Sequence, residues 1–371
     1  MKFLDTSLKA KQCVGCAACA AICPRGCISM SYNTEGFLIP HIDITNCDHC
    51  NFCYGVCSIE KYRVEVSPIV SFASWNLNED IRNKSSSGGI FTALANNVIK
   101  NGGVVVGAAF CDNLVVRHII VRDNIERFRG SKYVQSEIPV DIYYEMGKLL
   151  KKNISVLFSG TPCQVAAMRS FFREHDNLIC CDVACHGVPS PLLLKKYIGD
   201  ELNKISFRDK TTGWKNYSVY KHFKNGKIEI KPASTDPYMI AFLRDYALRP
   251  SCYDCKFKGK YRKGDLTLAD FWGDNVYNSD DKGISLVIVN TEKGKSLLES
   301  CSKDIFLSPV NIDTYSLNNT MLIKSCVRPI ERDMFYKDLV EMSFLNIIQK
   351  YHLFPVQTRW ERIKKWVGNI I

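Results

Sequence analysis

The sequence has no long hydrophobic run and little repetition. None of its 371 residues belong to a segment of roughly 18 uninterrupted apolar residues, the length of a membrane-spanning helix. The stretch 1–12 lacks the apolar core of a secretory signal peptide. There is no low-complexity tract, and the only repeat is a pair of cysteine runs. These absences argue against a helical membrane protein and a secreted one, and we expect a cytoplasmic protein.

The composition is that of a folded globular chain. Hydrophobic residues make up 46% and charged residues 23% of the sequence. At roughly 100–200 residues per domain, the length allows two or three domains. Eighteen cysteines are many for this length. In a reducing compartment, clustered cysteines bind metal more often than they form disulfides.

Eight of the cysteines form two runs with the same internal spacing. The first run is Cys13, Cys16, Cys19 and Cys23, and the second is Cys47, Cys50, Cys53 and Cys57. In such runs three closely spaced thiolates bind one 4Fe-4S cluster and the fourth binds the other cluster. We therefore predict one centre bound by Cys13, Cys16, Cys19 and Cys57, and one bound by Cys47, Cys50, Cys53 and Cys23.

Two features bear on this interpretation. Pairs of the type C-x2-C also bind zinc, but two complete runs with Pro24 after the first favour clusters. Ser58 follows Cys57 where a proline is usual, at a position that binds no iron. The additional Cys27 is expected to be a buried core residue rather than a ligand.

The segments around these runs predict two domains. Residues 27–32 and 37–44 indicate two strands around the turn 33–36, and residues 1–62 are expected to form an α+β ferredoxin-like module. Residues 63–345 alternate short apolar runs with helical patterns, which predicts an α/β domain with a mostly parallel sheet. Its expected strands are 103–110, 154–158 and 178–183, with helices at 89–100, 139–152, 162–175 and 191–202. Asn225-Gly226 indicates a hairpin between 217–223 and 227–231.

Three polar turns lie where strands end or helices begin, at 85–89, 159–164 and 185–190. In an open α/β sheet such turns gather at one edge and bind ligands there. Each turn taken alone also fits an ordinary helix cap. The remaining thiols with metal-binding potential are Cys163, Cys185, Cys252 and Cys255. Cys252 and Cys255 alone also fit a zinc half-site, and Cys163 a buried thiol.

Six motifs in a fixed order resemble one protein family. They are Ser86-Ser87-Gly88-Gly89, the segment 130–136 (GSKYVQS), the segment 160–164 (GTPCQ), the segment 185–190 (CHGVPS), the pair Cys252 and Cys255, and the segment 268–273 (LADFWG). This set resembles the family of coenzyme F-420 hydrogenase/dehydrogenase beta subunits, over about residues 10–275. The last hundred residues carry little of the resemblance.

The resemblance implies a flavin-binding α/β domain and an oxidoreductase with FAD and iron–sulfur clusters. It implies that Cys163, Cys185, Cys252 and Cys255 bind a third cluster beside the flavin. It also implies FAD contacts from a further set of residues, namely Ser86, Ser87, Gly88, Gly89, Lys132, Tyr133, Gln135, Ser136, Thr161 and Gln164. The flavin supplies the reactivity, and the protein supplies position and charge.

Two residues are candidates for a catalytic role. Lys132 would stabilise the anionic reduced flavin if it lay near the ring, but it also fits a solvated surface lysine. His186 follows a predicted cluster ligand and would donate to a sulfur or carry a proton, but it also fits a loop histidine with its hydrogen bonds satisfied. Asp270 and Trp272 are expected to pack the cluster loop rather than to act in catalysis.

The C-terminal segment 346–371 contains a basic amphipathic pattern. Trp360, Ile363, Trp366 and Val367 fall on one helical face. Such a helix fits peripheral contact with an anionic membrane, or docking on the protein's own surface or on a partner. The pattern alone leaves these alternatives open.

The formal net charge of +11, taken alone, would favour a nucleic-acid partner. Three clusters with their thiolates, each of net charge about −2, would lower the total to about +5. Because no nucleic-acid-binding fold is recognisable either, we expect no nucleic-acid partner. No separate C-x3-C-x2-C run of a radical enzyme is present either.

The sequence therefore predicts a flavin and iron–sulfur oxidoreductase. Its electrons would pass between a hydride donor, coenzyme F-420-like or other, and a redox partner protein. The alternative is a non-catalytic, ferredoxin-type electron-transfer subunit of a larger redox complex. The direction of electron flow and the oligomeric state are left open.

Overall fold

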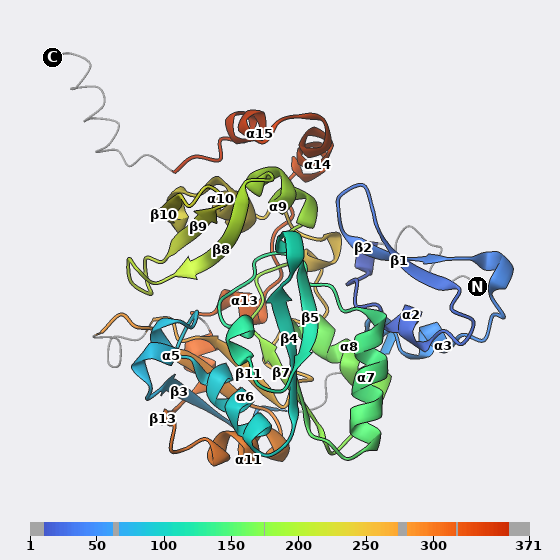
Figure 1. Ribbon diagram of the computed structural model, residues 1–371, viewed down its shortest axis with the longest axis vertical. Helices are drawn as coiled ribbons and strands as arrows, with labels where there is room; N and C mark the ends of the chain where they lie inside the picture. Colours follow the sequence, from blue (N-terminus) through green and yellow to red (C-terminus); the bar gives the residue numbers. More distant parts are fainter. Residues whose placement is uncertain (1–10, 62–66, 174, 274–279, 317, 356–371) are drawn as a thin grey trace.

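The computed structural model describes residues 11–61, 67–173, 175–273, 280–316 and 318–355. In Figure 1 a small cysteine-rich module, blue, lies beside α7 and α8 at the side of a larger α/β body. The predicted amphipathic face of the C-terminal segment lies outside the described residues. Among the described helices, none is long and apolar enough to cross a membrane.

The cysteine-rich module consists of one hairpin and short helical turns. Strands β1 (Ile28–Tyr32) and β2 (Leu38–Ile42) pair antiparallel, as the hairpin prediction requires. Gly36 in the turn has φ +80°, and a Cβ there would lie 2.6 Å from Leu192 Cβ, so only glycine fits. The helical turns are α2 (Ala18–Ile22), η1 (Ile44–Asn46), α3 (Phe52–Gly55) and α4 (Ser58–Lys61).

The large body is built on an eight-stranded sheet of order β13-β3-β12-β11-β7-β6-β4-β5. Its strands are β3 (Val70–Asn76), β4 (Val104–Phe110), β5 (Val116–Val121), β6 (Val156–Gly160), β7 (Leu178–Val183), β11 (Leu266–Asp270), β12 (Ser285–Val289) and β13 (Ile305–Val310). The central strands β11, β7, β6 and β4 are parallel to one another, and the pairings outside them are antiparallel. The mixed α/β class with a largely parallel centre is confirmed.

Helices cover both faces of this sheet. Along β4, Val105 and Ala109 face the cluster that contains α6 and α11, whereas Val104 and Val106 face the cluster that contains α7 and α8. A strand buried on both faces explains the continuous apolar run of β4. The helices of the large body are α5 (Glu79–Asn83), α6 (Ile90–Lys100), α7 (Val140–Lys151), α8 (Pro162–Phe172), α9 (Pro191–Ile198), α10 (Pro237–Leu243), α11 (Glu292–Ser300), α12 (Ile312–Ser316), α13 (Thr320–Ile323), α14 (Arg332–Glu341) and α15 (Phe344–Lys350).

Two predicted helices are too long, and the one expected over 162–175 ends at Phe172 as α8. The pattern indicated a helix over 191–202, but α9 ends at Ile198, Gly199 turns the chain with φ +57°, and Leu202 already begins a strand. The cause is tertiary, since β8 (Leu202–Asp209) pairs with β9 (Ser218–Phe223), and β9 pairs with β10 (Ile228–Pro232). The β9–β10 hairpin was predicted from its Asn-Gly turn and is confirmed.

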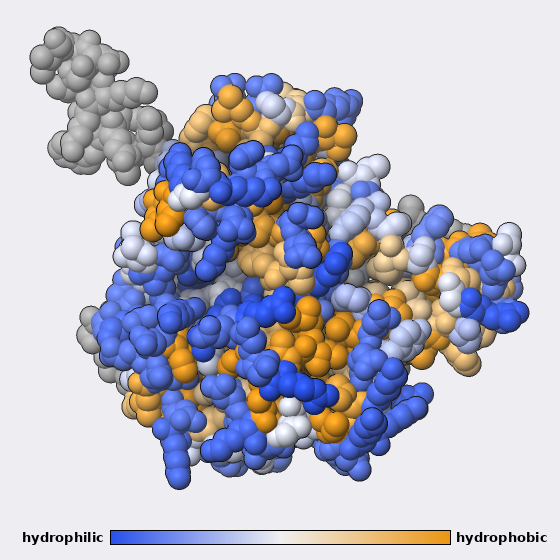
Figure 2. All heavy atoms as spheres, viewed as in Figure 1, coloured by the Kyte–Doolittle hydropathy of each residue, from blue (hydrophilic) through white to orange (hydrophobic). Residues whose placement is uncertain are grey.

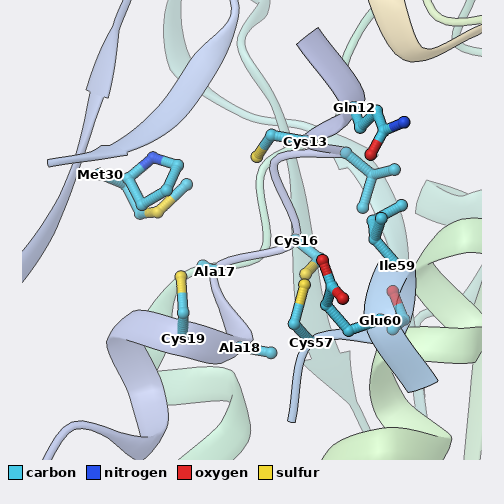
Figure 3. A pocket seen from close by; sticks show the side chains of 13 residues that line it. Gln12, Cys13, Cys16, Ala17, Ala18, Cys19, Met30, Cys57, Ile59 and Glu60 are labelled. Atoms are coloured by element: carbon cyan, nitrogen blue, oxygen red, sulfur yellow. The ribbon is translucent and has the colours of Figure 1, made fainter. Parts of the chain in front are cut away.

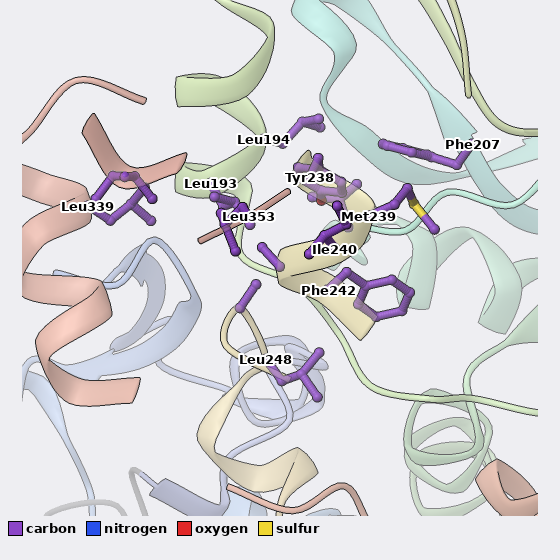
Figure 4. Packing of buried hydrophobic residues seen from close by; sticks show 14 of the residues in the cluster. Leu193, Leu194, Phe207, Tyr238, Met239, Ile240, Phe242, Leu248, Leu339 and Leu353 are labelled. Atoms are coloured by element: carbon purple, nitrogen blue, oxygen red, sulfur yellow. The ribbon is translucent and has the colours of Figure 1, made fainter. Parts of the chain in front are cut away.

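The three-stranded sheet packs with helices in a second core. Figure 4 shows Leu193 and Leu194 from α9, Phe207 from β8, and the apolar face of α10 converging there. Phe37 of the cysteine-rich module is fully buried in the same cluster. The module is therefore joined to the large body by shared core packing. The outer face in Figure 2 is mainly hydrophilic, with apolar residues gathered over β4 and β5.

Candidate metal centres and cofactor site

Four thiols of the module surround one cavity. Cys13, Cys16, Cys19 and Cys57 line it together with Met30 (Figure 3). Burial, together with the nearby thiols of Cys13 and Cys57, raises the pKa of the Cys16 thiol to about 12. Cys57, from the second run, therefore lies with the first three cysteines of the first run. This is the crossed arrangement that the spacing predicts.

The second set gathers around Cys23. Burial raises the pKa of Cys53 first, and the charges of Cys50 and Cys23 add to it. Cys47 packs with Cys23 and Cys53 in one small cluster of partly buried residues. Cys27 is buried in this cluster as predicted, with its Sγ 3.3 Å from Cys23 Sγ. Its thiol therefore lies next to the predicted ligands and not in a separate core.

Both runs turn tightly around their thiols. Gly15, Ala17, His49 and Asn51 all have positive φ, between 55° and 69°. Left-handed residues point successive backbone N–H groups inward, and Gly15 N donates to Cys13 Sγ at 3.4 Å. Such donors suit a sulfur-rich anionic cluster. The thiols and the backbone of both runs thus fit 4Fe-4S centres.

The large body supports the first set from outside. The carbonyl of Cys13 accepts from Arg249 Nη1 at 2.8 Å and from Ser251 Oγ at 3.1 Å. The carbonyl of Cys16 accepts from Tyr143 Oη at 2.7 Å. Arg249 and Ser251 shortly precede Cys252 in the chain. A short hydrogen-bonded connection therefore joins the first set to a thiol of the predicted third set.

The structure brings the other four predicted ligands together at one edge of the sheet. Cys163 lies in the first turn of α8, Cys185 follows β7, and Cys252 ends η5 (Pro250–Cys252). Burial raises the pKa of Cys163 well above its usual value, and the charges of Cys255, Cys185 and Cys252 raise it further. Four thiols brought together from three separate segments are the donor set that a 4Fe-4S centre needs.

Two of the predicted flavin loops meet through their serines. Ser131 Oγ donates to Ser86 Oγ at 2.9 Å, while Ser87 Oγ donates to the carbonyl of Ile284 at 2.7 Å. Gly88 is packed so closely that a Cβ would lie 2.5 Å from the Ser74 carbonyl oxygen. Gly89, with φ +82°, precedes α6 as its N-cap. The loop 86–89 therefore needs glycine for backbone packing and presents Ser86 toward the loop 130–136.

A second connection leads from this loop to the third set of thiols. Gln164 Nε2 donates to Ser136 Oγ at 3.0 Å, and Gln164 Oε1 accepts from Thr161 N at 3.0 Å in a capping box. Thr161 Oγ1 lies 3.1 Å from Cys163 Sγ. Ser136, Thr161 and Gln164 are thus part of one polar network that ends at a predicted cluster ligand.

Gln135 lies elsewhere, at the junction with the cysteine-rich module. Its Oε1 accepts from Arg249 Nη2 at 2.5 Å and from Leu38 N at 3.2 Å. The side chain is buried, and its Nε2 has no partner among the described residues. Its predicted flavin contact therefore draws no support from its position.

Lys132 is engaged with the backbone. Its Nζ donates to the carbonyls of Arg127, Phe128 and Arg129, at 3.1, 2.8 and 2.9 Å. These carbonyls close η3 (Ile125–Phe128), so the lysine caps this turn. All three ammonium donors are used, and contact with a flavin would require one of them to be exchanged. The neighbouring Tyr133 packs its ring on Phe207 and Phe242.

His186 is held by a carboxylate. Its Nε2 lies 2.7 Å from Asp245 Oδ1, and its ring meets Phe242 edge to face at 5.0 Å. The neighbouring Lys258 Nζ donates to the carbonyl of Cys185. The histidine therefore has a fixed orientation at the edge of the third thiol set.

Several contacts near these sites were not predicted from the sequence. Lys210 Nζ donates to the Ser87 carbonyl at 2.7 Å, which places a partly buried amine against a predicted flavin loop. Arg208 pairs with Asp270 at 2.5 Å and stacks on Tyr217 at 4.6 Å. Asp270 also accepts from Trp214, so this motif residue joins the two sheets. Lone charged residues on a strand give no signal in sequence, because their partners are distant in the chain.

Two sequence comparisons with known proteins, a family model and one relative, agree with the resemblance. Residues 154–314 match the family described as the C terminus of the coenzyme F420 hydrogenase/dehydrogenase beta subunit, and residues 12–60 match a 4Fe-4S dicluster domain. The F subunit of the F(420)H(2) dehydrogenase of Methanosarcina mazei is 21% identical over 308 residues, which cover 77% of this chain and 81% of that protein. A chain of the F420-reducing [NiFe] hydrogenase complex from Methanosarcina barkeri superposes with a TM-score of 0.49 at 16% identity, over 77% of this chain and 92% of that chain.

Proposed function

We infer that this chain is a flavin- and iron–sulfur-dependent oxidoreductase, because it belongs to the family of coenzyme F420 hydrogenase/dehydrogenase beta subunits. The dicluster domain at residues 12–60 supports iron–sulfur electron transfer. In this proposal electrons pass between a hydride donor, FAD, three 4Fe-4S clusters and a redox partner. The donor class is coenzyme F-420-like, which is the class that the name of the M. mazei relative indicates.

The observation that carries this proposal is the connection between the thiol sets. Cys13 belongs to the first set and Cys252 to the third, and Arg249 and Ser251 bind the Cys13 carbonyl from the segment that leads into Cys252. Electron transfer through protein needs centres that are close and held at a constant separation. A buried arginine and a serine at this junction hold the two ligand loops together.

FAD would be held by the loops at 86–89 and 130–136 and by the turn at 161–164. The Ser131–Ser86 hydrogen bond and the Ser136–Gln164 hydrogen bond make these loops one continuous polar surface. Lys210 behind Ser87 donates to the carbonyl of this residue and so holds the loop in place. Bound flavin would supply the exchange between two-electron hydride chemistry and one-electron cluster chemistry.

His186 would act at the third thiol set. Its contact with Asp245 fixes the orientation of the ring next to the cluster loop. Lys132 would stabilise charge indirectly, by holding the carbonyls of η3 and so the start of the loop 130–136.

One observation favours the simpler alternative of a non-catalytic electron-transfer subunit. The donors of Lys132 and the acceptor of Gln135 are engaged with protein atoms, so two residues assigned to the flavin have other roles. A subunit with clusters and no substrate site of its own needs none of these contacts. Its electrons would come from a partner subunit.

Quantifying iron, sulfide and flavin on one anaerobically purified sample distinguishes the two. About twelve irons and about one FAD per chain are expected for the oxidoreductase, since each cluster holds four irons. Reduced coenzyme F-420 would then be screened as donor. Iron without flavin would leave the electron-transfer subunit standing.

A further inference from the structure

Three side chains beside the third thiol set form a separate cluster of possible metal ligands, and of these the proposed function uses only His186. His186, Asp245 and Cys326 each offer one ligand atom, and these atoms all lie within 4.8 Å of one another. They come from the loop after β7, the turn after α10 and the segment after α13. In the part of the chain that the structure describes, no other group of histidine, cysteine and acidic ligands is this close.

The three residues are positioned from several directions. Asp245 has the left-handed conformation, with φ +63°, and its carbonyl accepts from Tyr253 Oη at 2.5 Å. Cys326 Sγ donates to the His186 carbonyl at 3.0 Å. The side chains of His186 and Asp245 are 25% and 18% exposed, so the group is reachable from solvent but largely enclosed. A non-glycine residue with positive φ at such a point fits a constrained functional position.

We propose that His186, Asp245 and Cys326 bind a mononuclear Zn2+ ion, separate from the iron–sulfur centres. One imidazole, one carboxylate and one thiolate are all zinc ligands, and three protein ligands leave a fourth position open for water or a substrate oxygen. The thiolate and the carboxylate together balance the charge of a divalent cation. The site would thus be neutral, which suits its partial burial.

The geometry needs only a small adjustment. Two ligands of a tetrahedral zinc, each about 2.0–2.3 Å from the metal, lie roughly 3.3–3.7 Å apart. His186 Nε2 and Asp245 Oδ1 are 2.7 Å apart and would move apart by about 1 Å or less. On binding, Cys326 loses its thiol proton and Nε2 its hydrogen bond to Asp245, and any released protons go to solvent. Lys258 Nζ donates to two carbonyls of this loop, and its positive charge would repel the metal.

The test uses the full chain with its clusters reconstituted first, so that vacant cluster sites do not take up zinc. The protein is incubated with Zn2+ or with Co2+ and desalted, and zinc and iron are measured on the same sample. We expect about one zinc per chain, and with Co2+ a thiolate-to-cobalt absorption band. Cys326→Ser and Asp245→Asn should each weaken zinc retention at least about tenfold while the iron content is unchanged.

Two controls keep the outcomes apart. Cys111→Ser removes a partly buried thiol that contacts the Ala109 carbonyl, and it should leave zinc unchanged. Zinc that had replaced a cluster would be lost in Cys252→Ser and kept in Cys326→Ser, which would overturn the proposal. Loss of iron in Cys326→Ser, or equal zinc in Cys326→Ser and the parent protein, would overturn it as well. Low iron in every sample would count against the proposed function alone.

Discussion

The two cysteine-rich regions of the molecule both bring four-thiol sets together, but one does so with local loops and the other with segments distant in the chain. In residues 13–57 eight thiols come from two local loops with left-handed turns, and few apolar residues are buried around them. At the edge of the large sheet, four thiols come from segments that a central core of strands and helices holds together. From this difference we predict that the module depends on its clusters for structure, whereas the sheet keeps its shape without one.

Removing iron should reveal the largest difference between the two regions. On anaerobic chelation we expect amide hydrogen exchange to become fast through most of residues 11–61, because the module's own apolar cluster has only three small buried members, Ala20, Cys27 and Ile28. Strands β4, β6 and β7 should keep their protection. Equal loss in both regions, or retained protection in the module, would contradict the distinction.

Exchanging single thiols tests the crossed arrangement within the module. Cys57→Ser should perturb the centre that Cys13, Cys16 and Cys19 bind, and Cys23→Ser the other centre. Each variant should lose up to about four irons and a different component of the reduced EPR spectrum. If each variant perturbed the centre bound by its own run, ligation would be local and not crossed.

Cys252→Ser tests the four thiols at the edge of the large sheet. We expect a loss of about four irons, with the EPR components of the N-terminal centres kept and the far-ultraviolet circular dichroism unchanged. The matched control is Cys301→Ser, a buried cysteine of the large body whose thiol donates to the Leu297 carbonyl. Unchanged iron in Cys252→Ser would remove the third centre from the proposal.

The sheet should respond to acid through a buried histidine. Burial lowers the pKa of His118 to about 4, and its Nε2 lies 3.1 Å from the Ser159 carbonyl oxygen. Since the folded-state pKa lies below the unfolded value of about 6.5, the stability that the neutral ring contributes is present above pH 6.5 and is lost as the pH falls toward 4. The loss is up to about 3 kcal/mol.

Denaturant unfolding at several pH values measures this effect. His118→Phe should lower stability at neutral pH, because the Ser159 carbonyl loses its partner, yet flatten its decline between about pH 6.5 and 4. His41→Phe, at an exposed position of the module, is the control. An unchanged slope in His118→Phe would show that the acid response arises elsewhere.

The smallest effect is expected from Lys132. Lys132→Met removes three hydrogen bonds to the carbonyls that close η3 and should lower stability by about 1–3 kcal/mol. Lys151→Met, at an exposed lysine of α7, should change stability little. A lower flavin content or a shifted flavin potential at unchanged stability would instead assign Lys132 to the cofactor.

Local signals predicted much of this molecule. The β1–β2 hairpin, the β9–β10 hairpin and the starts of α6, α7 and α8 follow from turn residues, caps and apolar periodicity. The predicted end of α9 was wrong by about one helical turn, because Leu202 belongs to strand β8 and pairs with Phe223 of β9. Boundary errors of this kind are expected where tertiary pairing overrides local propensity.

The sequence by itself determined the two four-cysteine runs and the family motifs, because three of the four thiols of each N-terminal set lie within a few residues of one another and their spacing is the signal. Only the tertiary structure decided that Gln135 accepts from Arg249, and that Asp245 and Cys326 meet His186. These contacts join residues 59 to 140 positions apart. Nothing in local spacing records such a contact, since the packing of the sheets and helices creates it.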